Sequence, residues 1–414
     1  MGRPRPSSPA DDVGAPRTIV TISPKGAGRP TGTNELFALL SWLRMTPPPS
    51  HLVLVADRAT GVDRWASELG TTDGVSTSIV YRELRDPDDY IPSQVKDETH
   101  APNFKRVIKI AEAAVQPLRT RDSNDNDADL FVYANSDIVM PSTFVGTIRR
   151  IVAASARAAQ QPTSRVVLTG IKTDCASLAL PSEQMSLRGL AAKYSTYAHA
   201  VARELRNRRC TPHSPSGKDY WVYTRGFWES SAAGGIPPLA LGRPHFDNYL
   251  TKLADARGVA VDTSPVITAA HLGHGYAHAG RGAGNSKTFW LSAMGKYNLR
   301  LAIRSYKKIN THEPWFIKIG DIDHLTWQAC PAEVACATTP APGEGATVFI
   351  RVKPGKGRSS FPHRLQMGNR TIASEGACDY ATTFGCYGRL PDSLCQPHLV
   401  ASRKAHMCGD DYPA

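Results

Sequence analysis

The chain has 414 residues, of which 41% are hydrophobic and 21% charged, and its formal net charge is +12. This balance is typical of a folded globular protein and excludes a wholly disordered chain. No apolar run approaches the roughly 18 residues of a membrane-spanning helix, so we expect no transmembrane segment.

The first structured element is expected after a disordered tail, residues 1–16, rich in Pro, Ser and Asp. A strand over 18–22 leads into a loop with glycines and the cations Lys25 and Arg29, and a helix begins near Thr33. A basic glycine loop before a helix N-terminus is suited to binding an anion. The glycine spacing fits neither a Walker A motif nor a dinucleotide-binding fingerprint.

Strands and amphipathic helices then alternate along the chain. We expect strands over the apolar runs 51–56, 78–81, 129–134, 165–169 and 259–262. The alternation predicts an α/β fold with a mostly parallel sheet and helices on both faces. The Ala-, Leu- and Arg-rich segment 175–212 is expected to be helical.

Two carboxylates end strands of this pattern. Asp57 follows the strand 51–56, and Asn135-Ser136-Asp137 interrupts the apolar run 129–140. Ligands collect beyond the carboxyl ends of the strands in open α/β sheets, so we expect Asp57 and Asp137 at one edge, where a nucleotide could bridge them. Asp137 would face a metal or a polar substrate. The alternative is that Asn135 and Asp137 only turn the chain and cap the next helix.

The region 218–228 surrounds Asp219 and an arginine with aromatic residues, among them Trp221. Aromatic faces beside carboxylates suit carbohydrate rings. The alternative is a core strand with a buried tryptophan.

Asp247 lies in the first turn of a predicted helix, where a carboxylate is favoured electrostatically. It is either a helix-start residue or a general base held ionised by the helix N-terminus. His271, His274 and His278 follow, but their glycine-interrupted spacing does not fit a regular zinc motif. One histidine reaching a metal held by Asp137 is the better reading.

Four short motifs, taken together and in this order, resemble those of a known protein family. They are Tyr-Ala-Asn-Ser-Asp-Ile, Asp-Tyr-Trp-Val-Tyr-Thr-Arg-Gly, Leu-Gly-Arg-Pro-His-Phe-Asp-Asn and His-Leu-Gly-His-Gly-Tyr. Over about residues 17–300 the chain resembles glycosyltransferase-like proteins of the nucleotide-diphospho-sugar transferase (GT-A) type. The resemblance implies a GT-A-like domain over 17–328 that transfers a sugar from a nucleotide-sugar donor to a glycan or glycoconjugate acceptor.

The resemblance also implies roles for single residues. Asn135 and Asp137 match a metal-binding Asp-x-Asp motif in which an asparagine replaces the first carboxylate. Mn²⁺ or Mg²⁺ would be held by Asp137 with His271 or His274, and would neutralise the departing diphosphate. Asp57 would contact the base or ribose, and Lys25 or Arg29 the phosphates. Asp247 would be the catalytic base. Asp219, Trp221 and Arg243 would bind substrate.

Residues 329–414 form the second predicted unit, a small basic module. It holds six of the eight cysteines, from Cys330 to Cys408, while Cys175 and Cys210 stand alone in the main body. Such a set suggests disulfides, and the sequon at Asn369 lies among them. Both favour the lumen of the secretory pathway, whereas the N-terminus lacks the apolar segment of a cleavable signal.

The cations of the stretch 351–370 favour an anionic partner, or form only a solvated loop. No specific nucleic-acid motif accompanies them. Two alternatives to transfer stay open. One is a non-catalytic nucleotide- or glycan-binding module on the same fold, and the other is a metal-dependent hydrolase using the histidines.

Overall fold

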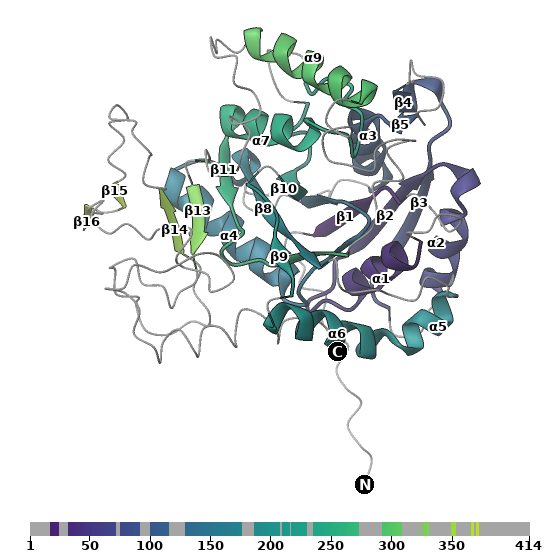
Figure 1. Cartoon of the computed structure of the whole chain (residues 1–414). Helices are drawn as coiled ribbons and strands as arrows, with labels where there is room; N and C mark the ends of the chain where they lie inside the picture. Colours follow the sequence, from purple (N-terminus) through teal and green to yellow (C-terminus); the bar gives the residue numbers. More distant parts are fainter. Residues whose placement is uncertain are drawn as a thin grey trace, which may run out of the picture.

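Twelve strands of the described residues form one twisted sheet, as a computed structural model of the chain shows (Figure 1). The structure describes residues 17–24, 32–71, 75–91, 100–115, 129–175, 186–207, 209–215, 217–229, 235–272, 292–308, 322, 325, 327–330, 349–352, 366–367 and 370–371.

The main path of the sheet has the strand order β14-β13-β11-β8-β10-β6-β1-β2-β3. These strands are β1 (Thr18–Ile22), β2 (His51–Ala56), β3 (Ser78–Glu83), β6 (Leu130–Ala134), β8 (Val166–Cys175), β10 (Lys218–Thr224), β11 (Val259–Asp262), β13 (Trp327–Cys330) and β14 (Phe349–Val352). Three short strands attach beside this path, namely β7 (Ile138–Val139), β9 (Thr211–Pro212) and β12 (Ala269–Leu272).

Five of the eight pairings along the main path are parallel, which confirms the predicted α/β architecture. β1 pairs in parallel with β2 and β6, and β11 with β8 and β13. β10 is the exception in the centre, because it is antiparallel to both β6 and β8. The cause lies in β9, which pairs with Thr173 and Asp174 near the end of β8. The chain therefore returns to the sheet at this edge and enters β10 from it.

Helices cover both faces of the sheet. The helices are α1 (Gly32–Leu43), α2 (Val62–Gly70), α3 (Phe104–Ala114), α4 (Phe144–Ala159), α5 (Leu187–Ala192), α6 (Tyr194–Arg206), α7 (Phe246–Arg257) and α9 (Ala293–Lys308). α3, α7 and α9 lie together on one side, above the sheet in Figure 1, and α1, α5 and α6 lie below it. Apolar side chains of α1, α2, α4, α5 and α6 form one core with one face of the sheet, and those of α3, α7 and α9 form the other.

Successive side chains of β6 point alternately into the two cores, as expected for a strand buried on both faces. Leu130, Val132 and Ala134 belong to the core under α1 and α4, while Phe131 and Tyr133 belong to the core under α3 and α7. The polar triplet 135–137 thus begins where a fully buried strand stops.

The segment 175–212 is helical only in part. β8 runs six residues beyond the predicted strand end, to Cys175, and the two helices α5 and α6 follow. Cys175 and Cys210, which have no evident partner in the sequence pattern, form a disulfide. This bond ties the end of β8 to the segment that precedes β9.

Replacing Cys175 and Cys210 together with serine should lower the free energy of unfolding. The bond closes a loop with a sequence separation of 35, and the loop entropy of the unfolded chain corresponds to about 3–4 kcal/mol. Urea denaturation of the double variant measures the loss. Reduction of the parent protein should give the same loss, and a reduced parent as stable as the oxidised one would contradict the expectation.

The predicted boundary at residue 328 falls inside the sheet. β13 crosses this position, and β14, which belongs to the predicted C-terminal module, pairs with it in antiparallel register. β15 (Gln366–Met367) and β16 (Arg370–Thr371) form a separate two-stranded pair. The predicted disulfides among the C-terminal cysteines lie outside the described residues. Among the helices that the structure describes, none is long and apolar enough to cross a bilayer.

At the N-terminal end of β6, a buried carboxylate of α3 meets the turn after β10. Glu112 accepts hydrogen bonds from the Gly226 amide at 3.1 and 3.2 Å, and the Arg225 guanidinium donates to the Glu112 carbonyl. Arg225 lies 3.7 Å from Asp129, which also pairs with Arg17. Burial raises the pKa of Glu112 to about 7, although Gly226 and Arg225 oppose the rise.

Glu112→Gln should therefore stabilise the protein at pH 8 more than at pH 5. The raised folded-state pKa means that Glu112 contributes stability below its unfolded pKa and loses it as pH rises through about 7. The difference between the two pH values should be about 2 kcal/mol, measured by urea denaturation. Glu83→Gln, which removes a carboxylate paired with the exposed Arg85 and does not act on the pKa of Glu112, is the control and should show no such difference.

Candidate functional site

The turn 135–137 places Asp137 against a strand from late in the sequence. β7 follows the turn and pairs in antiparallel register with β12, so that Ile138 lies opposite His271. β12 also pairs in parallel with the end of β8, which sets His271 opposite Asp174. Asp137 is buried, with 4% of its surface exposed. Strand pairing thus brings together residues from three distant segments at the edge where β6 ends.

The side chains of this edge form a connected polar chain. His271 Nε2 lies 3.8 Å from Asp137 Oδ1, and His271 Nδ1 lies 2.9 Å from Asp174 Oδ1. The second oxygen of Asp174 lies 2.6 Å from Nδ1 of His213. Hydrogen bonds from His213 and His271, with Lys172 nearby, hold the pKa of Asp174 well below its ordinary value against the opposing effect of burial.

Asn135, the first residue of the triplet, faces a carboxylate of β10. Its amide donates to Asp219 Oδ1 at 2.6 Å, and its Oδ1 accepts from the Tyr133 hydroxyl at 3.1 Å. Lys172 Nζ lies 3.1 Å from the other oxygen of Asp219. Burial lowers the pKa of Lys172, but Asp219, Asp174 and Asp137 outweigh it and raise that pKa well above its usual value. Lys172 therefore stays a cation amid three carboxylates.

Ser136, the middle residue, points to the opposite side of the turn. Its hydroxyl donates to Glu35 Oε1 at 2.6 Å, and both groups are buried. Because the triplet is held on one side by Glu35 of α1 and on the other by Asp219 of β10, the position of Asp137 is tightly fixed. The triplet does not cap α4. The N-cap residue of that helix is Thr143, and it makes no side-chain cap bond.

Asp247 begins α7 beside the start of β10. Its Oδ2 accepts from the Lys218 amide at 3.3 Å, and its Oδ1 accepts from the Asn248 amide at 2.9 Å. Burial raises the pKa of Asp247; Lys218 opposes the rise and neighbouring Asp219 adds to it. Asp247 and Asp219 thus lie close enough to influence each other, which links the two motifs.

The loop before α7 is fixed by α9. The buried Asn298 accepts from the Ala240 amide at 2.8 Å and donates to the Pro244 carbonyl at 3.1 Å. His245 precedes α7 with a positive φ of 67°, and burial lowers its pKa to about 4. Arg243 is buried in this loop, 8% exposed.

Asp57 occupies a separate place along the same edge. Its Oδ1 caps the short helix 58–60 by accepting from the Ala59 amide at 2.8 Å, and its Oδ2 accepts from the Tyr90 hydroxyl at 2.8 Å. β1 lies between β2 and β6, so their ends are roughly 10 Å apart at the usual strand spacing. That separation leaves room for a ligand to span from Asp57 to Asp137.

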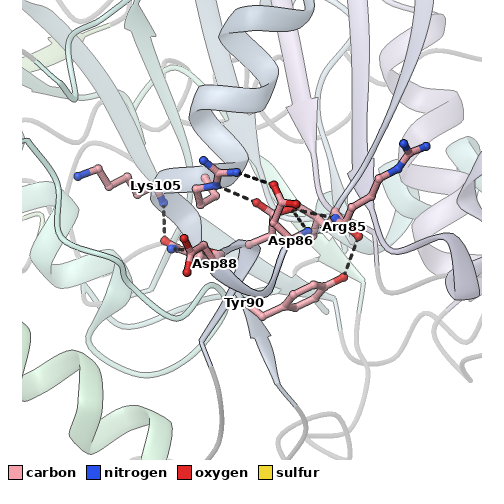
Figure 2. A network of polar contacts seen from close by, with 9 residues as sticks. Arg85, Asp86, Asp88, Tyr90 and Lys105 are labelled. Carbon is pink, nitrogen blue, oxygen red and sulfur yellow. Dashed lines mark hydrogen bonds and ion pairs between the residues drawn. The ribbon is translucent and has the colours of Figure 1, made fainter.

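Tyr90 follows a turn that is itself braced by ion pairs. The buried Asp89 accepts from the Arg85 and Asp86 amides at 2.9 Å each and from Arg106 Nε of α3 at 2.8 Å. Figure 2 shows Arg85 and Asp86 side by side in this turn, with Tyr90 at its exit and Lys105 on the neighbouring helix. The network holds Tyr90, and through it the carboxylate of Asp57.

Trp221 packs in the core. Of its two interpretations, a carbohydrate-binding surface and a core strand with a buried tryptophan, the structure favours the second. The ring is fully buried, 0% exposed, between Tyr133 at 6.1 Å and Phe246 at 5.5 Å between ring centroids. β10 is a buried central strand, and alternation turns Trp221 into the core while Asp219 lies at the strand end. No face of the ring is exposed to an acceptor.

Lys25, Arg29 and His274 lie outside the described residues. The part of the chain that the structure describes holds no group of three or more His, Cys, Asp or Glu side chains that could bind a metal ion. Within it, Asp137 and His271 offer one oxygen and one nitrogen donor, types that suit Mn²⁺.

Sequence reasoning did not find Lys172, Asp174 and His213. The alternating pattern Gly170-Ile171-Lys172-Thr173-Asp174 is a strand signal that extends β8 to the site edge. Recognising that extension would have placed Asp174 at a strand end, like Asp57 and Asp137.

Comparison with known proteins gives distant likenesses. No protein-family model and no curated protein matches the chain. Among solved structures it is similar to mannosyltransferase PcManGT from Pyrobaculum calidifontis in complex with GDP-Man and Mn2+, at 12% identity and a TM-score of 0.33, over 74% of this chain and 73% of that one.

It is also similar to S. aureus TarS 1-349, at 10% identity and a TM-score of 0.29. That match covers 62% of this chain and 57% of that one. A further likeness is mannose-6-phosphate isomerase from Helicobacter pylori, at 10% identity and a TM-score of 0.25, over 51% of this chain and 72% of that one. Likenesses at this level assign no family.

Proposed function

We propose that the chain is a glycosyltransferase of the GT-A type, which binds a nucleotide-sugar at the sheet edge between Asp57 and Asp137 and transfers its sugar to a glycan or glycoconjugate. The supporting observation is convergence. Asp137, Asp219, Asp247 and His271 come from four separate sequence motifs. Asp137 lies near His271, Asn135 and Lys172 join this turn to Asp219, and Asp219 influences Asp247 electrostatically, so the four residues lie in one region. A purely structural set of four motifs has no reason to meet at the ligand-binding edge of a sheet.

The proposed division of labour follows the position of each carboxylate. Asp57, fixed by Tyr90, contacts the ribose or base of the donor. Asp137 faces the diphosphate side, where with His271 it would hold a divalent cation, which when bound neutralises charge on the departing diphosphate. Asp247 takes the proton from the acceptor hydroxyl, and Asp219 binds the acceptor beside it.

Asp247 is suited to proton removal because its ionised form is held but poorly solvated. Two backbone amides donate hydrogen bonds to it, while burial and Asp219 raise its pKa, and a higher pKa makes a carboxylate a better proton acceptor. Lys218 limits that rise.

The experiment is a transfer and donor-hydrolysis assay over a panel of nucleotide sugars, with and without Mn²⁺. Turnover of one donor, lost in Asp137 and Asp247 variants, supports the proposal. The bonding of Asn135 to Asp219 favours one alternative, a module that binds without catalysis, since the residue at the first motif position is engaged in holding the turn. Calorimetry that shows nucleotide-sugar binding without turnover in any condition would establish that alternative and reject transfer.

A further inference from the structure

Asp174 is the one carboxylate of the described site that contacts two histidines at once. Its Oδ1 lies 2.9 Å from Nδ1 of His271, and its Oδ2 lies 2.6 Å from Nδ1 of His213. His213 lies 39 residues away in sequence and His271 lies 97 away. Each carboxylate oxygen of Asp174 therefore contacts a different imidazole ring, and both rings make this contact through Nδ1.

The chemistry of the groups fixes where the protons lie. An ionised carboxylate only accepts hydrogen bonds, so both Nδ1 atoms must carry a proton to bond with it. A hydrogen bond made by one ring nitrogen determines the state of the other. The Nε2 atoms are then the ones left for other partners. In His271 this atom faces Asp137 at 3.8 Å, and in His213 it belongs to a half-buried ring with 31% of its side-chain surface exposed.

Three features of the backbone hold His213 in place. β9 ends at Pro212, directly before the ring, and the disulfide of Cys210 anchors the same segment to Cys175, the neighbour of Asp174. The His213 amide donates to the Lys172 carbonyl at 2.9 Å. A Cβ at Gly217 would lie 1.9 Å from His213 Cδ2, so only glycine lets the ring lie where it does.

The turn that carries His213 leads directly to the acceptor side of the proposed site. Gly217 is followed by Lys218, whose amide donates to Asp247, and by Asp219. The same turn contacts β8 through the bond from the Lys172 amide to the Gly217 carbonyl at 3.1 Å. His213 is thus joined to both halves of the site.

We infer that Asp174 is a positioning residue that fixes the Nδ1–H form of both His271 and His213, and that His213 is a second histidine of the site, joined to His271 through the two oxygens of Asp174. The hydrogen-bond arrangement stands by itself, whereas its effect on sugar transfer rests on the proposed function.

Asp174→Asn tests the arrangement without an activity assay. Asparagine keeps the shape but has one acceptor oxygen and one donor group, so it can satisfy the Nδ1–H of only one ring. Long-range ¹H–¹⁵N NMR of the full chain with labelled histidine, at pH 8.5, reports which nitrogens carry protons. His213→Gln and His271→Gln identify the two signals. In the parent protein both rings should be protonated at Nδ1, and in Asp174→Asn one of them should lose that proton.

Two further variants make the result specific. Gly217→Ala should displace His213 alone, so His271 should keep its Nδ1 proton while the His213 signals change. Asp262→Asn, which removes a buried carboxylate bonded to Ser264 and Gln328 at the end of neighbouring β11, should leave both rings as in the parent. If both rings keep Nδ1–H in Asp174→Asn, or if neither carries it in the parent, the inference is wrong.

For the donor found by the transfer assay, Asp174→Asn should lower kcat by about 10–100-fold, the usual cost of losing a group that orients a functional histidine, with a smaller change in KM. An unchanged kcat overturns the positioning role. Absence of turnover in the parent chain rejects the proposed function instead, and the NMR result still decides the state of the two rings.

Discussion

Asp247→Asn should lower kcat for sugar transfer by about 10²–10⁴-fold, the range expected for loss of a general base, while donor affinity changes little. Asparagine fills the same space but cannot take a proton from the acceptor hydroxyl. The half-buried carboxylate is held in place by hydrogen bonds from the amides of Lys218 and Asn248. Steady-state kinetics with varied acceptor concentration measures the change.

Loss of stability does not explain such a result, because the charge of Asp247 is unfavourable in the fold. Its folded-state pKa is raised, so its contribution to stability is present at acid pH and is lost as pH rises through that pKa. At neutral pH the asparagine variant no longer bears that cost. The unfolding temperature of the variant should therefore be equal to or higher than that of the parent. The only opposing effect is the weakening of one hydrogen bond from a backbone amide.

Asp255→Asn is the matched control, since it makes the same chemical change in the same helix. Asp255 lies at the far end of α7, where it pairs with Lys252 at 3.5 Å. Its replacement should leave kcat unchanged. Equal kinetics for the two variants would show that Asp247 only begins the helix. Transfer by the parent should also weaken in acid, as Asp247 becomes protonated above the ordinary carboxyl pKa.

Asp137→Asn should lower kcat/KM by about 10²-fold or more. Asp137 is buried and faces His271, and loss of one member of a buried charged contact costs about 2–5 kcal/mol. At 1.4 kcal/mol per tenfold, this corresponds to between one and four orders of magnitude. The effect should be larger than that of Asp86→Asn, which removes an exposed carboxylate paired with Arg106 in the turn of Figure 2.

The metal arm of this experiment separates two roles for Asp137. If the carboxylate holds a cation, chelation should reduce parent activity to the level of the variant, and Mn²⁺ should restore the parent alone. If it contacts a sugar hydroxyl or phosphate-bound water, chelation has no effect and the variant remains slow. Full activity of Asp137→Asn in both conditions would remove Asp137 from the site.

Local sequence signals were enough to place several of the buried strands of the sheet. The apolar runs 18–22, 51–56 and 259–262 match β1, β2 and β11 to the residue, because strands buried on both faces leave an uninterrupted apolar signal. The direction of β10 was not predictable in this way. It depends on β9, a strand of two residues that pairs with β8 across a long connection.

Partners across the site were less accessible to sequence reasoning than the strand ends. Asp57 and Asp137 carry a positional signal because they follow apolar runs. Asp174 carries such a signal only once the strand is extended through the alternating residues 170–174, and His213 carries none, since its importance arises from contact with a residue far away in the chain. Trp221 shows the converse: its aromatic context suggested a binding surface, but only the strand's two-faced burial shows that the ring is inside.

The pairing of β13 with β14 has a practical consequence for dividing this protein into pieces. A fragment ending at residue 328 would keep Trp327 and Gln328, which pair with β11, but it would lose the rest of β13 and all of β14, and so leave the amides and carbonyls of β13 without their antiparallel partner. Open sheet edges recruit strands from other molecules, which leads to aggregation. Recombinant fragments of the α/β domain should therefore extend at least to Val352 if they are to remain soluble.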